Sequence, residues 1–105
     1  MTANLLADLP DASTGEIFTE LLARPGVRIE RIVSQGQATP ADAPMVQDWN
    51  EWVLLLEGAA GLRIEDGPEL RLAPGDHALI AAGQEHWVTW TPDDRATVWL
   101  AVHLG

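Results

Sequence analysis

The stretch Met45–Gly58, MVQDWNEWVLLLEG, places a carboxylate at the head of an apolar run. Residues 52–56, WVLLL, form a short apolar run bounded by turn residues, which is consistent with a buried β-strand. Glu51 directly precedes this run. A carboxylate at the rim of a core is costly to desolvate unless a charged or hydrogen-bonding group meets it. The rest of the sequence must therefore supply a partner for Glu51.

Turn-forming residues recur at short, regular intervals along the chain. They are Arg24-Pro25-Gly26, Gln35-Gly36, Thr39-Pro40, Gly58, Asp66-Gly67-Pro68, Pro74-Gly75-Asp76, Gly83 and Pro92-Asp93-Asp94. Short segments separated by turns at this spacing are typical of an all-β sandwich or barrel. The sequence predicts an all-β, antiparallel β-barrel or jelly roll, with strands expected over residues 77–81, 85–91 and 96–103. The 105 residues suit a single domain, with an N-terminal extension and first element over 1–26 and a barrel core over 27–103.

The segment Ser13–Ala23 has two interpretations. Ser13 followed by Glu16 fits a helix capping box, and the apolar residues that follow have helical spacing. The segment also runs through a Pro-Gly turn into Val27–Ser34, which is a good strand. We therefore favour a strand that forms a hairpin with 27–34.

The segment Leu62–Leu72 predicts a second hairpin. With residues 66–68 as a three-residue loop, Ile64 faces Leu70 and Leu62 faces Leu72, so that the apolar side chains share one side. The like charges on the other side are opposite each other, and each arginine has a glutamate on the diagonal. The following Pro74-Gly75 pair predicts a type II turn.

Four residues could converge on one interior point. Glu51 opens one expected strand, His86 lies near the start of a second and His103 ends a third, while Gln47 lies upstream of Glu51. In a closed barrel, side chains from different strands can meet inside. Imidazole, carboxylate and amide oxygen together are a plausible ligand set for a divalent metal. The metal-free alternative is a direct hydrogen bond or ion pair between Glu51 and His86.

The spacing of these residues resembles the motifs of the cupin superfamily, a family of small β-barrels. Glu51 is followed by Gly58 at the spacing of the first cupin motif. Gly75, Gly83 and His86 keep the Gly–Gly–His spacing of the second motif, in which Ala81 replaces the usual proline. The resemblance covers roughly residues 27–103 and implies a cupin-type barrel.

The resemblance also implies a set of metal ligands, from which this chain departs. Cupins commonly hold a metal with two histidines and a glutamate from the first motif and one histidine from the second. The last two correspond to Glu51 and His86, whereas the histidine pair falls on Met45 and Gln47. The implied site holds Mn, Fe, Ni or Zn on Glu51 and His86, with Gln47 and His103 as further candidate ligands. No organic cofactor is implied.

Strand alternation extends the predicted site to a pocket. If Glu51 faces the interior, so does Val53, and His86 shares its face with Val88 and Trp90. Trp99 shares parity with His103, so Trp90 and Trp99 are expected to wall a pocket for a small-molecule ligand. Trp52 and Trp87 point the other way and could supply the apolar centre of a homodimer interface.

The composition of the chain limits the classes of partner that we expect it to bind. The formal net charge is −10, which opposes binding to nucleic acid or to an anionic membrane surface. The chain has no cysteine, and therefore no disulfide or thiolate chemistry. Its N-terminus lacks the basic and apolar regions of a signal peptide, and no apolar stretch reaches the length of a membrane span. A cytoplasmic location is expected.

Three functions remain open on the sequence alone. The first is a metal-dependent enzyme, for which the resemblance permits oxygenase, isomerase and decarboxylase chemistry. The second is a small-molecule-binding or sensing barrel, with or without a metal. The third is a structural dimeric domain with a degenerate site. Retention of Glu51 with His86 favours the first two, and loss of the histidine pair favours the last two.

Overall fold

The structure is built from eight β-strands. A computed structural model describes residues 2–105, and within them the secondary structure contains no helix. The strands are β1 (Ile17–Arg24), β2 (Val27–Ser34), β3 (Asn50–Glu57), β4 (Ala60–Ile64), β5 (Leu70–Leu72), β6 (His77–Ile80), β7 (His86–Trp90) and β8 (Thr97–Leu104). Every strand pairing is antiparallel, which confirms the all-β expectation. Across the described residues, no helix has the length and apolar character needed to cross a membrane.

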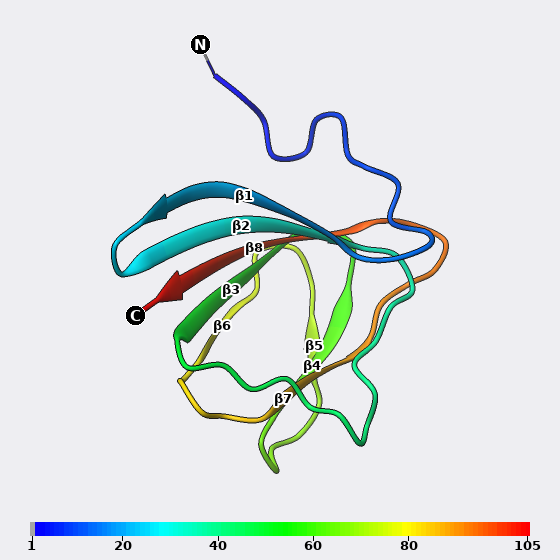
Figure 1. Cartoon of the computed structure of the whole chain (residues 1–105). Coiled ribbons are helices and arrows are strands. Elements are labelled where there is room, and N and C mark those ends of the chain that lie inside the picture. The colour runs from blue at the N-terminus through cyan, green and yellow to red at the C-terminus, as the bar shows by residue number, and fades with distance from the viewer. Residues whose placement is uncertain (1) are drawn as a thin grey trace.

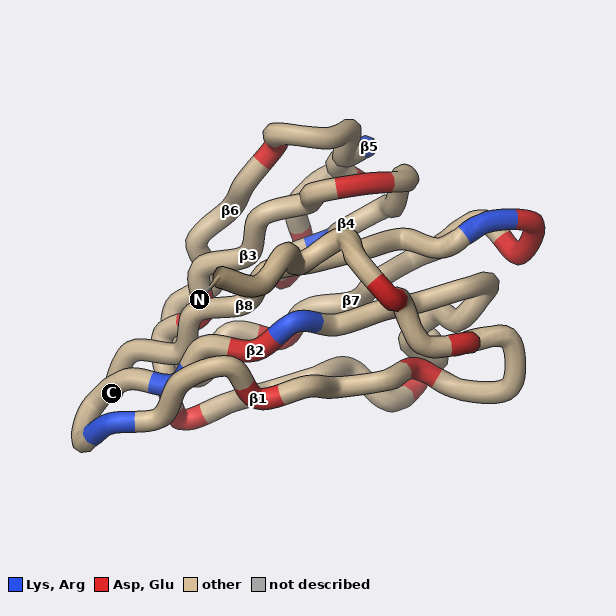
Figure 2. The backbone as a smooth tube through the Cα atoms, turned by 90° about the horizontal axis from the view of Figure 1, so that it is seen from above, with Lys and Arg blue, Asp and Glu red and all other residues tan. Residues whose placement is uncertain are grey.

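The strands form two sheets that face each other (Figure 1). The larger sheet has the order β1-β2-β8-β3-β6, and the smaller has the order β5-β4-β7. The N-terminal segment before β1 lies over the outer side of β1 and β2 (Figure 1). Acidic residues are spread along the whole chain rather than gathered on one face (Figure 2).

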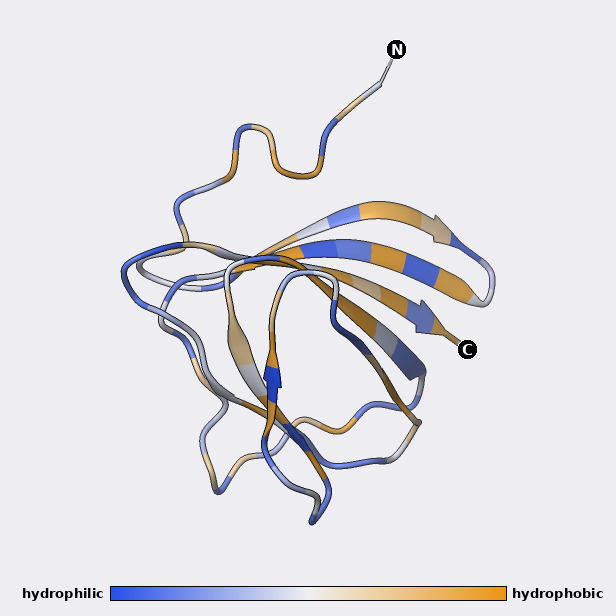
Figure 3. Cartoon of the chain, turned by 180° about the vertical axis from the view of Figure 1, so that it is seen from behind, coloured by the Kyte–Doolittle hydropathy of each residue, from blue (hydrophilic) through white to orange (hydrophobic). Residues whose placement is uncertain are grey.

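The core lies between the two sheets. In the larger sheet, β2 shows bands of hydrophilic and hydrophobic residues, whereas β3 and β8 are mostly hydrophobic (Figure 3). The buried apolar cluster draws on five strands, β3, β4, β5, β6 and β8, and its members are Val53, Leu55, Ala60, Leu62, Leu72, Ile80, Trp99 and Ala101. The apolar run that follows Glu51 therefore anchors this core, with Val53 and Leu55 pointing inward.

The β1–β2 hairpin has the strand form favoured by the sequence. β1 pairs with β2 from Ile17 opposite Val33 to Arg24 opposite Val27, with a register shift between Glu20 and Leu22. The strand interpretation of this segment is therefore confirmed, and the capping-box pattern does not start a helix.

The predicted register of the second hairpin is wrong by two residues. Leu62 pairs with Leu70, and Leu72 pairs with Ala60. Ile64, which was expected to face Leu70, pairs instead with His86 of β7. Because the shift is an even number of residues, each leucine keeps its expected face.

The loop of this hairpin explains the error. It spans residues 65–69 rather than 66–68, because Glu65 adopts a left-handed conformation with φ 51°. The amide of Gly67 donates to the carbonyl of Ile64 at 3.0 Å, which closes the turn one residue earlier than the sequence suggested. The predicted diagonal charge pairs do not form either, since Arg63 stacks over Trp87 at 4.3 Å.

The connection between β2 and β3, residues 35–49, covers the free edge of β7. The amide of Thr39 donates to the carbonyl of Val88 at 2.8 Å, and Thr39 Oγ1 accepts from the amide of Val88 at 3.0 Å. Further along, Met45 and His86 exchange two backbone hydrogen bonds of 2.9 and 3.0 Å. The connection is thus fixed to the smaller sheet at two points and closes one side of the interior.

Candidate functional site

Glu51 meets Gln47 and His86. Gln47 Nε2 donates to Glu51 Oε1 at 2.6 Å and lies 3.5 Å from His86 Nε2. Glu51 Oε1 and His86 Nε2 are 3.7 Å apart. Glu51 and His86 are both buried. The two hydrogens of one amide therefore face a carboxylate and an imidazole, and we call these three residues the Glu51 triad.

The backbone places Gln47 in this triad. The bridge between Met45 and His86 aligns the connection beside β7, and the carbonyl of Gln47 accepts a hydrogen bond from the amide of Gly83 at 2.8 Å. Gln47 is thus held by its own carbonyl and by the bridge two residues before it. Met45 contributes mainly through its backbone, and its side chain lines the interior beside Gln47.

A backbone carbonyl fixes the orientation of the His86 ring. Nδ1 of His86 lies 3.2 Å from the carbonyl oxygen of Gln84. A carbonyl oxygen can only accept, so Nδ1 carries the proton and Nε2 holds the lone pair in the neutral ring. The basic nitrogen of His86 is therefore directed at Gln47 and Glu51.

His103 forms a side-chain hydrogen bond with a residue of another strand. Its Nε2 lies 2.9 Å from Oε1 of Glu30 on β2, and both side chains are largely buried. Glu51 and His103 are direct neighbours in the β3–β8 ladder. The ring of Trp49 contacts His103 edge-on, with 6.5 Å between ring centroids.

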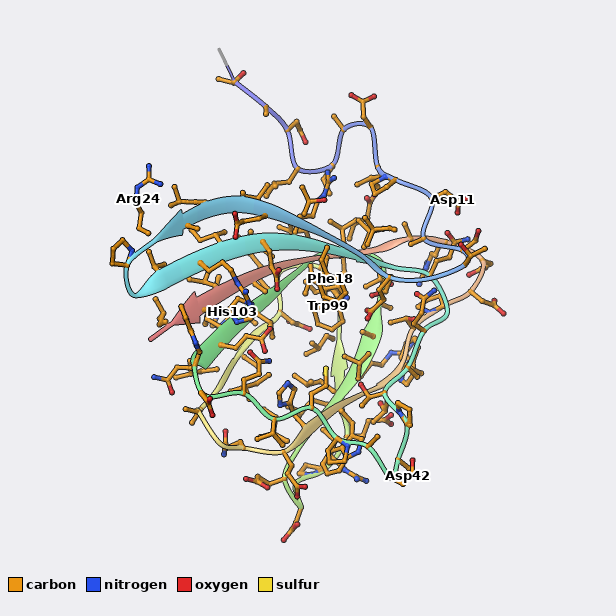
Figure 4. All side chains as sticks on the ribbon, viewed as in Figure 1. Asp11, Phe18, Arg24, Asp42, Trp99 and His103 are labelled. Carbon is orange, nitrogen blue, oxygen red and sulfur yellow. The ribbon has the colours of Figure 1, made fainter. Side chains whose placement is uncertain are left out.

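These residues line one internal cavity of about 510 Å³. Its polar wall contains the Glu51 triad, the Glu30–His103 pair, Glu16, Arg28 and Gln37. Its apolar wall includes three predicted pocket residues, Val53, Val88 and Trp99, together with Phe18, Ile32, Leu62 and Ile80. Figure 4 shows Phe18, Trp99 and His103 on the inner side of the larger sheet. A volume of this size is within the range of small-molecule sites.

Trp90 does not line this cavity, although strand alternation predicted it. The ladder between β4 and β7 shifts register between Gly61 and Leu62, so that Gly61 pairs with Trp90 and Leu62 with Val88. The extra residue of this bulge turns Trp90 to the face opposite Val88. There the ring packs over Gly61 and beneath Arg71, whose guanidinium carbon lies 5.1 Å from the ring centroid.

The donor set does not fit a divalent metal in this arrangement. Glu51 and His86 supply two strong donors, but Gln47 directs its amide nitrogen rather than its oxygen at them, and an amide N–H does not ligate a metal. His103 is already bonded to Glu30. Throughout residues 2–105, no cluster of three or more His, Cys, Asp or Glu side chains is arranged to hold an ion. Protein sites for such metals normally use three or four side-chain ligands.

Three charged residues of the cavity wall belong to no sequence motif and were not predicted as site residues. Glu16, Arg28 and Glu30 come from β2 and from the residue before β1. Arg28 and Glu30 alternate with the apolar Ile29 on the same strand, and apolar alternation alone would point Ile29 inward. The pairing of β2 with β8 would have identified these residues, because it places Arg28 directly opposite His103.

Two facing antiparallel sheets with a polar cavity between them define a small jelly-roll protein. Residues 31–103 match the family described as the cupin domain. Because that match spans more than half of the chain, this protein belongs to the cupin family. None of the curated proteins matches the sequence.

Solved structures agree with this assignment. A Ralstonia eutropha JMP134 protein, provisionally named a mannose-6-phosphate isomerase, is 41% identical, with a TM-score of 0.94 over 99% of this chain and 97% of that one. A cupin superfamily protein from Desulfitobacterium hafniense DCB-2 is 17% identical, with a TM-score of 0.77 over 98% and 90%. The DMSP lyase DddQ from Ruegeria pomeroyi DSS-3 is 20% identical, with a TM-score of 0.75 over 99% and 55%. The last two show a shared fold only.

Proposed function

We propose that this cupin binds a small, hydrogen-bond-donating molecule that is uncharged or cationic. The observation that carries the proposal is the cavity itself, which combines an apolar wall with a buried Glu51 triad. Within the triad Glu51 accepts one hydrogen bond from Gln47, which leaves most of the acceptor capacity of its carboxylate available to the cavity. Buried acceptors of this kind favour a ligand that brings its own donors, because an unpaired polar group is costly inside a protein.

The charge of the cavity argues against a phosphorylated ligand. Glu16, Glu30 and Glu51 face the cavity, whereas Arg28 is the one arginine among its lining residues within the described part of the chain. A phosphate group brings negative charge and acceptor oxygens, and proteins usually hold it with arginine, lysine or helix N-termini. The Ralstonia relative is named for a phosphorylated sugar. We propose that the ligand of this chain is uncharged or cationic and carries no phosphate group.

Thermal shift measurements with three sets of compounds test the proposal. The sets are neutral sugars and polyols, small primary amines, and sugar phosphates including mannose 6-phosphate. A ligand that binds only the folded state raises Tm, and the stabilisation grows with the logarithm of its concentration over Kd. We expect stabilisation from the first or second set and none from the third. Glu51→Gln should abolish the shift, whereas Glu57→Gln, at the exposed end of the same strand, should retain it. Stabilisation by sugar phosphates alone would contradict the proposal.

Metal binding between Glu51 and His86 is the competing function. The orientation of His86 favours it, since metal-binding histidines usually donate the other ring N–H to a carbonyl or carboxylate. Elemental analysis after incubation with Mn, Fe, Ni or Zn and desalting decides between the two. We expect well below one equivalent of metal per chain. A stoichiometric metal that His86→Ala removes would replace our proposal with a metal site.

A further inference from the structure

A second carboxylate–imidazole pair faces the same cavity. His103 lies on β8 and Glu30 on β2, and the 2.9 Å bond between them joins side chains that are 4% and 13% exposed. An ionised carboxylate only accepts, so His103 donates its Nε2–H to Glu30. This one bond uses only part of the acceptor capacity of Glu30, which is about four hydrogen bonds for a carboxylate. The pair can therefore receive further donors from the cavity.

Fold stability does not explain why this pair is buried. A buried ion pair is often no more stabilising than apolar side chains of similar size, because both charges lose their hydration. Next to the pair, the same strands use apolar residues on the same face, namely Ile32 on β2 and Trp99 and Ala101 on β8. The chain thus places two ionisable groups beside apolar residues on one face of these strands, and that face lines the cavity. Ionisable groups retained in this way mark candidate functional sites.

The pair lies beside the Glu51 triad. Glu51 and His103 are directly opposite in the antiparallel ladder, and such residues have Cβ atoms about 4.5–5.5 Å apart. Arg28 is opposite His103 on the other side, so three ionisable residues form a row across β2, β8 and β3. The cavity thus offers two acceptor carboxylates, Glu51 on β3 and Glu30 on β2, with His103 on the intervening strand β8.

We propose that Glu30 and His103 form a second anchor for the ligand, and that the ligand is an uncharged polyhydroxylated compound of monosaccharide size. This inference rests on the proposed binding function and narrows its ligand class. Hydroxyl groups donate and accept, so a polyol with several of them satisfies both Glu51 and Glu30 without adding charge. Its carbon skeleton packs against the apolar wall formed by Val53, Val88 and Trp99.

Isothermal calorimetry with a panel of neutral compounds tests this inference. The panel contains mannose, glucose, fructose, mannitol and myo-inositol, and the strongest binder becomes the probe. A hydrogen bond to a charged group contributes about tenfold or more to affinity. We therefore expect Glu30→Gln and Glu51→Gln each to raise Kd by about tenfold or more. Glu57→Gln is the matched control and should leave Kd unchanged.

A second variant separates binding from folding. Glu30→Leu/His103→Leu replaces the pair with apolar side chains, so we expect Tm to stay the same or rise while probe binding is lost. A large fall in Tm would make the pair structural and overturn the inference. If Glu30→Gln binds like the wild type while Glu51→Gln does not, the second anchor is wrong and the proposed function stands. If no compound in the panel binds the wild type, the polyol class is wrong; binding of an amine would still support the broader function.

Discussion

At the scale of single residues, Gln47 provides much of what Glu51 needs in order to be buried. The carboxylate accepts a 2.6 Å hydrogen bond from the amide, which also lies 3.5 Å from His86 Nε2. The motif spacing was enough to predict that Glu51, His86 and Gln47 lie close together. Their role as metal ligands stays a prediction, and the amide orientation seen here favours a hydrogen-bonded triad.

Removing the Gln47 amide should destabilise the fold. In Gln47→Ala, the buried Glu51 loses a hydrogen-bond donor, and such a loss at a charged group costs about 1–3 kcal/mol. Urea denaturation should show this decrease in the free energy of unfolding. Asp42→Ala, at an exposed position of the same connection, should change it by less than about 0.5 kcal/mol. Equal stability of the two variants would mean that water or another group replaces the amide without cost.

A different substitution at Gln47 should create a metal site. In Gln47→His, an imidazole nitrogen takes the place of the amide beside Glu51 and His86, which raises the number of strong donors from two to three. Three side-chain ligands are the usual minimum for zinc and related metals. Elemental analysis should find close to one equivalent of Zn or Ni in this variant and far less in the wild type and in Gln47→Ala. Metal-free Gln47→His would show that the three side chains do not converge closely enough.

Glu30 shows why part of the site was hidden in the sequence. Val27, Ile29 and Val33 share one face of β2, and their apolar character suggests that this face points to the core. In the structure the N-terminal segment covers that face, where Arg31 Nη1 donates to the carbonyl of Leu5 at 3.1 Å. Glu30 therefore points into the cavity. Burial of both faces of a strand removes the contrast on which alternation depends.

At the scale of elements, irregularities in the sheets decided which predictions failed. Turn positions and strand types followed from the sequence, because proline fixes φ and glycine permits the positive φ that many turns require. The Leu62–Leu72 register and the placement of Trp90 did not, because a longer loop and a bulge each change the pairing. Both irregularities depend on contacts with β7 rather than on local sequence, since Ile64 pairs with His86 and the bulge lies in the β4–β7 ladder.

Substitution of two turn glycines tests how much each turn contributes to the stability of the fold. Gly58 and Gly75 both have left-handed backbone angles, with φ of 90° and 96°. An added Cβ at Gly58 would lie 2.7 Å from the Ala96 carbonyl oxygen, whereas at Gly75 it would meet nothing within 4 Å. Gly75→Ala should cost about 1–2 kcal/mol, the penalty for a left-handed alanine. Gly58→Ala should cost clearly more, because the β8 backbone must also move. Chemical denaturation of both variants measures the difference, and equal losses would contradict this reading of the turn.

At the scale of the whole molecule, surface chemistry bears on self-association. The predicted homodimer interface centred on Trp52 and Trp87, but both rings have partners within the chain. Trp52 stacks against His77 at 5.4 Å, and Trp87 Nε1 donates to the Ala41 carbonyl at 3.2 Å. β1, at one edge of the larger sheet, instead exposes Phe18, Leu21 and Leu22 by 58%, 44% and 39%. An exposed edge strand with large apolar side chains is a ready surface for pairing with another chain.

We therefore propose that the chain forms a homodimer in which the β1 edges of two copies meet. Edge pairing supplies backbone hydrogen bonds, and the apolar side chains supply buried area, which together offset mutual repulsion of two chains that each carry a net charge of −10.

Light scattering at physiological salt should give a dimer mass at high micromolar concentration. Leu21→Lys/Leu22→Lys should convert it to a monomer, because charged edge residues block strand pairing. Leu79→Lys, on β6 at the opposite edge of the same sheet, should remain dimeric. A monomeric wild type, or a dimer that only Leu79→Lys disrupts, would place the contact elsewhere or remove it.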